Sequence, residues 1–161
     1  MGDWNRTTQE CRVEDLSPGV NAAIQEHIQR HNLGSILNDA VLCIETTSTS
    51  KKKGLFGLGK AKVVVVQAML TPAWLVWVVT AQGSTTALSA RIEDIVVSDY
   101  EQSPGYKLVQ DTAIEVEGIF TGLVGSQGRR TVSMFIGLGQ ESAAVRFRQA
   151  LKDEVQKTRR P

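Results

Sequence analysis

The stretch that decides the fold is KVVVVQAMLTPAWLVWVVTA, residues 62–81. Residues 63–81 carry no charge, and nineteen such residues approach the length of a membrane-spanning helix. Thr71-Pro72 divides the run, however; the first half is rich in Val, and the second is rich in Val and Trp. A β-branched run divided by a proline predicts two buried strands, 62–70 and 73–81. Lysines precede the run, as on the cytoplasmic side of a membrane span, which keeps a span at 63–81 as an alternative. Because Pro72 divides the run, that alternative is the less favoured one.

Five further segments outside this stretch are predicted as strands. The clearest is AIEVEGIF, residues 113–120, where Ile114 and Val116 alternate with Glu115 and Glu117. Turn signals such as Gln82-Gly83 and Pro104-Gly105 separate the segments. The other four predicted strands span 39–49, 85–90, 94–100 and 130–137.

Two helices are predicted, one before the strands and one after them. Ser17 can cap a helix over 17–33, Pro18 suits its first position, and Gly34 suits its end. Residues 140–158 carry an apolar stripe at helical spacing, which consists of Ala143 or Ala144, Phe147, Leu151 and Val155. The polar residues 1–16 are expected to be a flexible arm.

Seven consecutive strands with short connections predict antiparallel pairing. Strands with one apolar face must curl into a small barrel or divide into two packed sheets. The closing helix is expected to cover one open end. The predicted fold is therefore mainly β with helices (α+β), in one domain over 17–161.

The stretch AMLTPAWLVWVVTAQGSTTALSARIEDIVVSDY, residues 68–100, is similar in layout to GRAM-type domains and to bacterial members of the pleckstrin-homology-like superfold. The segment 92–95, Ile-Glu-Asp-Ile, matches a short motif in those domains. The resemblance covers residues 36–158 and implies a seven-stranded barrel over 36–138 with a capping helix over 140–158. The helix over 17–33 is an addition to that pattern.

The charge distribution singles out KKKGLFGLGKAK, residues 51–62, because residues 46–90 hold five lysines and no acidic residue. The resemblance implies that this loop binds anionic lipid head groups, although the family pattern also favours an arginine that is absent here. The lysines concerned are Lys51, Lys52, Lys53, Lys60 and Lys62. Leu55, Phe56 and Leu58 are the candidate membrane contacts. The alternative is a mobile hairpin tip that its charge keeps soluble.

The same loop is one residue away from a nucleotide-binding P-loop. Gly54, Gly59 and Lys60 fit that pattern, but Ala61 replaces the hydroxyl residue that would bind magnesium. A valine run follows where a helix is required. Nucleotide binding is therefore not expected.

Other residues were weighed for metal, cofactor or catalytic chemistry. His27 and His31 have helical spacing for a shared metal but lack a third ligand. GLGQES, residues 137–142, lacks the third glycine of a dinucleotide loop. Glu115 and Glu117 fit a solvated strand face. The sequence therefore predicts no enzyme, no cofactor and no metal.

The expected function is binding. A protein-interaction module or scaffold is favoured, in which a peptide adds to a sheet edge or lies beside the closing helix. Peripheral binding to anionic membrane through residues 51–62 is the alternative. Arg129 and Arg130 add positive charge, but without an aromatic platform nucleic-acid binding is disfavoured.

The start of the chain contains no basic segment followed by an apolar run, so no signal peptide is expected. The expected location is the cytoplasm, with attachment at the inner membrane face under the lipid alternative. Cys11 and Cys43 are then expected as free thiols, although one bridge between them is possible.

Overall fold

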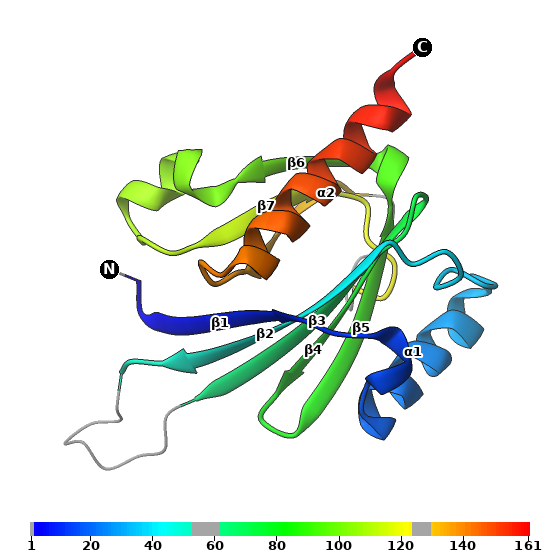
Figure 1. Cartoon of the computed structure of the whole chain (residues 1–161), viewed down its shortest axis with the longest axis horizontal. Coiled ribbons are helices and arrows are strands. Elements are labelled where there is room, and N and C mark those ends of the chain that lie inside the picture. The colour runs from blue at the N-terminus through cyan, green and yellow to red at the C-terminus, as the bar shows by residue number, and fades with distance from the viewer. Residues whose placement is uncertain (1, 53–61, 124–129) are drawn as a thin grey trace.

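The structure is a computed structural model that describes residues 2–52, 62–123 and 130–161. These residues form an α+β fold of two antiparallel sheets and two α-helices (Figure 1). One sheet has the order β1-β2-β3-β4-β5, with strands at Trp4–Glu10, Leu42–Ser50, Val63–Leu70, Trp74–Ala81 and Ser84–Arg91. The other has the order β6-β7-β8, with strands at Ile95–Asp99, Ala113–Gly118 and Val132–Gly137. The helices are α1, Pro18–His31, and α2, Ser142–Arg159.

Residues 63–81 form the hairpin β3–β4, so the alternative of a membrane-spanning helix is wrong. Pro72 lies in the turn between the strands, where its missing N–H costs no ladder hydrogen bond. The hydroxyl of Thr71 accepts a hydrogen bond from the backbone N–H of Trp74 at 2.9 Å and closes the turn. Among the described residues, no helix is both long and apolar enough to cross a bilayer.

The hairpin β3–β4 is buried on both faces, which explains its nearly continuous apolar sequence. Leu75 and Trp77 belong to a core between the two sheets, together with Phe147 of α2. Met69 and Val76 face the other way, into a second core beneath α1. The first sheet is therefore covered by α1 on one side and by α2 with the second sheet on the other.

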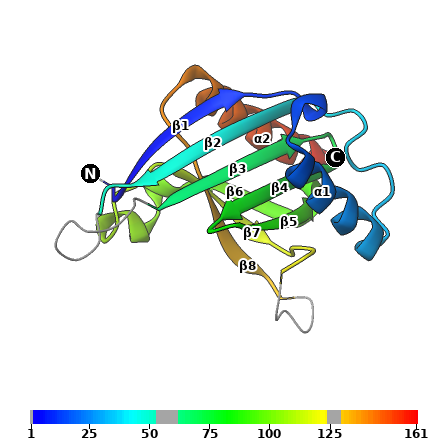
Figure 2. The same cartoon turned by 90° about the horizontal axis from the view of Figure 1, so that it is seen from below.

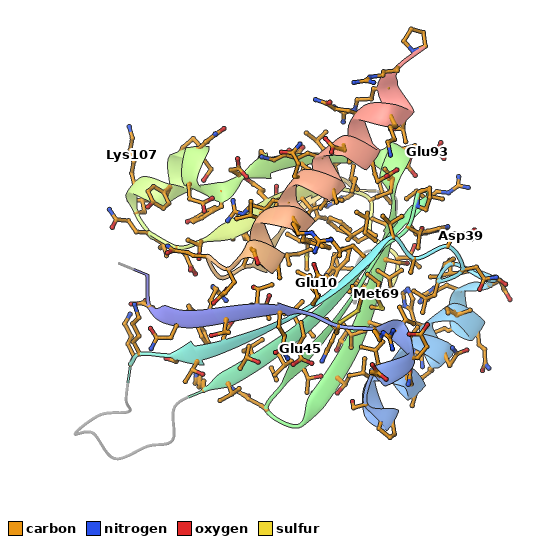
Figure 3. All side chains as sticks on the ribbon, in the orientation of Figure 1. Glu10, Asp39, Glu45, Met69, Glu93 and Lys107 are labelled. Carbon is orange, nitrogen blue, oxygen red and sulfur yellow. A yellow bond between two sulfur atoms is a disulfide. The ribbon has the colours of Figure 1, made fainter. Side chains whose placement is uncertain are left out.

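The two sheets form an open wedge and do not close into the expected barrel. They share one isolated bridge, between Ser89 and Thr121, close to the β5–β6 connection. Figures 1 and 2 show them diverging from there toward the side that carries the N-terminus. We call that side the open end and define it as residues 2–4, 50–52, 62–64 and 104–111. In Figure 3, Lys107 and Glu93 lie near the opposite ends of the layer that the sheet β6-β7-β8 forms with its connecting segments.

Each of the seven predicted strand segments overlaps one strand, and both predicted helices are present. Ser17 caps α1 as expected, through a hydrogen bond to the N–H of Val20. Asn32, not Gly34, is the left-handed residue that ends α1, although Gly34 also has a positive φ. The predicted stripe of α2 is buried in the core between the sheets.

The expectation of a flexible arm over residues 1–16 is wrong for residues 4–10, which form β1, an eighth strand paired with β2. The free-thiol expectation is also corrected, since Cys11 and Cys43 form a disulfide. The backbone N–H of Cys11 donates to the carbonyl of Cys43 at 2.9 Å beside this link. The disulfide therefore ties the segment between β1 and α1 to β2.

We expect Phe147→Ala to lower the free energy of unfolding by about 3–5 kcal/mol, because the ring is fully buried between the sheets. Val145→Ala on the same helix is the control, since that side chain is 61% exposed and should change stability by less than about 0.5 kcal/mol. Urea denaturation of both variants measures the difference. Equal midpoints for Phe147→Ala and the wild type would show that α2 does not pack as described.

Candidate functional site

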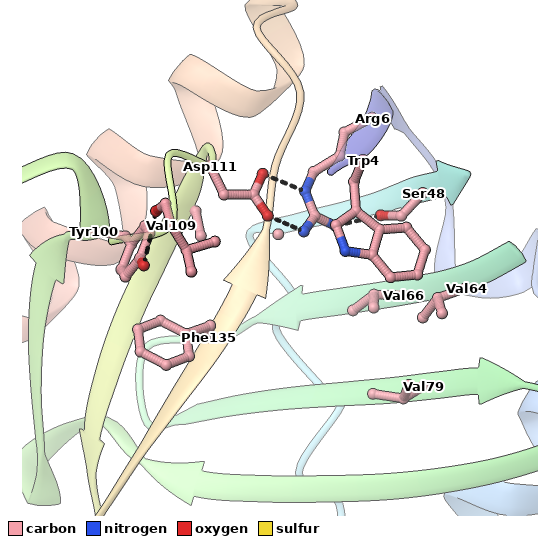
Figure 4. A pocket seen from close by; sticks show the side chains of 12 residues that line it. Trp4, Arg6, Ser48, Val64, Val66, Val79, Tyr100, Val109, Asp111 and Phe135 are labelled. Carbon is pink, nitrogen blue, oxygen red and sulfur yellow. Dashed lines mark hydrogen bonds and ion pairs between the residues drawn. The ribbon is translucent and has the colours of Figure 1, made fainter. Parts of the chain in front are cut away.

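A cavity of about 410 Å³ lies between the two sheets at the open end (Figure 4). Its floor is the inner face of the first sheet, where Val64, Val66 and Val79 are half-buried. Its opposite wall comes from β8 and from the segment that links β6 to β7. Aromatic residues at its boundary are Trp4, Tyr100 and Phe135. A volume of this size with a mainly apolar lining is typical of small-molecule binding sites.

One ion pair crosses the upper wall of the cavity. Arg6 of β1 donates from Nε and Nη2 to the carboxylate of Asp111, at 3.1 and 2.6 Å. Its Nη1 donates to the hydroxyl of Ser48 at 2.5 Å. The guanidinium of Arg6 is thus hydrogen-bonded to Asp111 on one side and to Ser48 on the other. These polar groups satisfy one another, and most of the remaining lining is apolar.

Gly137 of β8 makes room for Arg6. A Cβ at this position would lie 2.2 Å from Nη1 of Arg6, a distance that no real contact permits. The absence of a side chain at Gly137 therefore allows the guanidinium to lie against β8 and join the two layers. An alanine there would displace the arginine.

The mouth of the cavity is a hydrogen-bonded loop with exposed apolar side chains. The hydroxyl of Tyr100 donates to the carbonyl of Val109 at 2.9 Å, and its ring packs edge-on against Phe135 with centroids 5.0 Å apart. The 3-10 helix η5, Pro104–Lys107, precedes Leu108 and Val109, which are 89% and 52% exposed. Adjacent aliphatic side chains that are exposed on a hydrogen-bonded loop mark a candidate contact surface.

A second, polar cavity of about 330 Å³ adjoins the first. The two share Trp4 and Asp111 in their linings. The polar cavity also includes Lys51, which sequence analysis selected, and residues of the 104–111 segment. Its other polar lining residues are Tyr106, Gln110, Thr112 and Gln140.

The structure places three of the five predicted lysines at the open end. Lys51, Lys52 and Lys62 are exposed, and Lys52 forms an ion pair with Asp3 at 2.8 Å. The other selected residues, together with the P-loop-like segment, lie outside the described residues. They are Lys53, Lys60, Leu55, Phe56 and Leu58.

His27 is buried against β5 and does not share a metal site with His31. Its Nε2 lies 2.8 Å from the hydroxyl of Ser89, which is fully buried, and its ring is 4.9 Å from that of His31. Among the described residues, no group of three or more His, Cys, Asp or Glu side chains could hold a metal ion. Burial lowers the pKa of His27, and the charges of His31 and Arg30 lower it further.

Other motifs considered in the sequence analysis form hydrogen bonds within the fold. Gly139, in the segment 137–142, donates its N–H to the hydroxyl of Thr8 at 2.8 Å, and the Glu141 carboxylate accepts from the N–H of Thr8 at 2.9 Å. This turn therefore attaches to the edge of β1. Glu115 accepts a hydrogen bond from Ser133 on the neighbouring strand. Arg129 lies outside the described residues, and Arg130 is exposed.

A charge cluster joins α2 to the end of β6. Arg148 bonds Asp99 and Glu101, and Lys152 bonds Asp99 at 2.7 Å. Burial by itself would raise the pKa of Asp99, but the hydrogen bonds from Lys152 and Arg148 outweigh it and lower the pKa. The cluster fixes α2 against the second sheet.

Sequence reasoning missed the cavity and the Arg6–Asp111 pair. The partners are 105 positions apart and both lie in polar segments that show little apolar periodicity. The only local signal is the alternation in WNRTTQE, residues 4–10, which places Trp4, Arg6 and Thr8 on one face of a strand.

No family model, curated protein or solved structure matches this chain.

The lowered pKa of His27 predicts that folding stability depends on pH. The unfolded chain takes up the proton below about pH 6.5, whereas the folded chain resists it. Stability should therefore be complete above that pH and fall as the pH drops below it. Urea denaturation at pH 7.5, 6.5 and 5.5 tests this.

His27→Gln should reduce the loss of stability between pH 7.5 and 5.5, and His31→Gln is the control on the same helix. An NMR titration of the wild-type histidines should place the pKa of His27 below 6.5. A pKa above that value, or the same loss of stability in His27→Gln and wild type, would contradict the assignment.

Proposed function

We propose that this chain is a non-enzymatic binding module whose open end attaches to an anionic lipid surface. The observation that carries the proposal is the pair Leu108 and Val109, exposed on a held loop close to lysines. Apolar side chains at such a tip gain free energy by entering the acyl boundary of a bilayer. Lysines beside them gain from the negative surface potential.

The charges at the open end favour an anionic surface. Lys51, Lys52, Lys62 and Lys107 supply four positive charges, and Asp3 neutralises one through its pair with Lys52. A lysine near an anionic leaflet contributes about 1 kcal/mol. Such attraction is weak alone and needs the apolar contact of the loop tip.

Hydrogen bonds on both sides of the loop tip restrain it, which lowers the entropy lost on attachment. Tyr100 bonds the carbonyl of Val109, and Asp111 is held by Arg6. Leu108 and Val109 are thus presented from a rigid support at both sides.

The arrangement of β2 to β8 supports the proposed relation to the pleckstrin-homology-like superfold. Four strands lie in one sheet and three in the other, and a helix closes the chain. On this reading β1 and α1 are additions, and the β2–β3 connection corresponds to the basic loop. The relation is a proposal that rests on element order.

Binding of an extended protein segment is the second candidate. Within the described residues, β7 is the only strand that pairs with β8, and Phe135 of β8 is exposed. An unpaired strand edge can accept a peptide as a further strand. The first candidate is preferred because exposed aliphatic and basic side chains occur together at the open end.

Vesicle cosedimentation distinguishes the two candidates. Wild-type protein should bind phosphatidylserine-containing vesicles at low salt, bind them several-fold more weakly at physiological salt and not bind phosphatidylcholine vesicles, because the attraction is screened. Leu108→Asp/Val109→Asp should reduce binding at least tenfold, since two charges would enter the acyl boundary.

Val41→Asp is the matched control, because Val41 is as exposed as Val109 but lies at the opposite end of β2 from Lys51. It should bind vesicles like the wild type. Absence of wild-type binding even at low salt, or equal loss in the control, would overturn the lipid proposal and favour the protein partner.

A further inference from the structure

We propose that the apolar cavity between the two sheets binds a neutral, compact and largely hydrocarbon molecule, about the size of a bicyclic ring. The polar cavity that adjoins it takes no part in this contact. The inference concerns a ligand inside the protein and does not depend on attachment of the open end to a membrane.

The described part of the lining carries no net formal charge. Its charged side chains are Arg6 and Asp111, which form an ion pair at 2.6 Å. Asp111 also accepts a hydrogen bond from the backbone N–H of Thr112 at 2.8 Å. An anionic or cationic ligand group would have to compete with these existing partners, and a buried charge without a partner is costly. The charge balance therefore favours a neutral ligand.

The hydroxyl groups of the lining are engaged as well. Ser48 accepts a hydrogen bond from Nη1 of Arg6 at 2.5 Å, and Tyr100 donates to the carbonyl of Val109 at 2.9 Å. A ligand that depends on hydrogen bonds would lose its hydration and find few partners in the cavity. A hydrocarbon loses no hydrogen bonds on entry, so an apolar ligand is favoured over a polar one.

Several apolar side chains of the lining are only partly covered by the protein itself. Phe135 and Val109 are 55% and 52% exposed, and the three valines of the floor are half-buried. On the same face of β4, by contrast, Trp77 is 2% exposed, two residues before Val79. Because the gain on burial grows with the apolar area removed from water, an apolar ligand that covers these side chains is stabilised.

The Arg6–Asp111 ion pair opposes collapse of the empty cavity. Arg6 reaches from β1 to the segment that links β6 to β7, and it lies against Gly137 of β8. Both charged side chains are 15% exposed. Closing the two layers onto each other would displace this pair, and breaking a largely buried ion pair is strongly destabilising. The fold thus maintains a space that its own side chains do not fill.

The volume of the cavity sets the size of the ligand. An apolar cavity of about 150 Å³ is large enough to bind benzene. In proportion, the cavity of about 410 Å³ has room for roughly 15 non-hydrogen atoms. Trp4, Tyr100 and Phe135 offer aromatic faces and edges at its boundary, against which a ring of the ligand can pack. A rigid bicyclic molecule also loses little conformational freedom on binding.

Calorimetric titration of the full chain with naphthalene tests the proposal. Because naphthalene is sparingly soluble, the protein is titrated into the ligand. Naphthalene should bind, and benzene should bind at least tenfold more weakly because it buries less apolar surface. Naphthoate and naphthylmethylammonium keep the ring and add a negative or a positive charge. At neutral pH each should bind at least tenfold more weakly than naphthalene.

Two neighbouring valines on β3 provide matched variants. Val64→Phe places a ring in the apolar cavity and should weaken naphthalene binding at least tenfold. Val63→Phe is the control, because Val63 lies on the other face of the strand and is 48% exposed. Val79→Phe fills the same cavity from β4 and serves if Val64→Phe does not fold, which circular dichroism and the denaturation midpoint will show.

Leu108→Asp separates this site from the vesicle contact. Leu108 is 89% exposed and is not among the described lining residues, so the variant should retain naphthalene binding. Loss of naphthalene binding in Leu108→Asp would place the contact at the loop tip and overturn the proposal. So would the absence of binding by the wild type up to the solubility of naphthalene, equal binding of naphthalene and its charged analogues, or equal binding by Val64→Phe, Val79→Phe and Val63→Phe.

Discussion

The structure depends on the need to cover β3 and β4 on both faces. Their side chains are apolar on each side, so the sheet cannot leave either face in water. Helix α1 covers one face. The other is covered by α2 and the second sheet, but only over the half that contains Leu75 and Trp77. Val64, Val66 and Val79 line a cavity over the remaining half. The candidate site is thus the part of the inner face that the wedge leaves uncovered.

β1 converts this uncovered half into a defined cavity. The strand is polar toward the inside, and each inward side chain after Trp4 has a partner in the other layer: Arg6 bonds Asp111, and Thr8 bonds Gly139. Its far end is tied to β2 by the Cys11–Cys43 disulfide. These contacts hold the layers at a fixed separation. They also place Trp4 and Lys51 beside the segment of residues 104–111, where charge and apolar surface meet.

Local periodicity was sufficient for most elements. The apolar run over 63–81 is uncharged and divided by Pro72, and it forms the hairpin that this pattern predicts. The stripe of Phe147 and Leu151 likewise predicts the buried face of α2. The hydrophobic pattern led to a wrong prediction at residues 4–10. The inward residues of this strand include Arg6 and Thr8, so its sequence resembles that of a solvated arm. Spacing also did not distinguish His27 from His31, whereas in the structure His27 is the buried histidine, paired with Ser89.

The sequence by itself determined where strands and helices form and which of their faces are apolar, because spacing along the chain sets which side chains share a face. It also singled out Lys51 and its neighbours by charge. Only the tertiary structure decided that the sheets diverge, that β1 joins them, and that a cavity lies between Trp4 and Val79. The reason is that Arg6 and Asp111 acquire their roles from each other across 105 positions, and the angle between two sheets is set by such distant contacts. No local pattern encodes that distance.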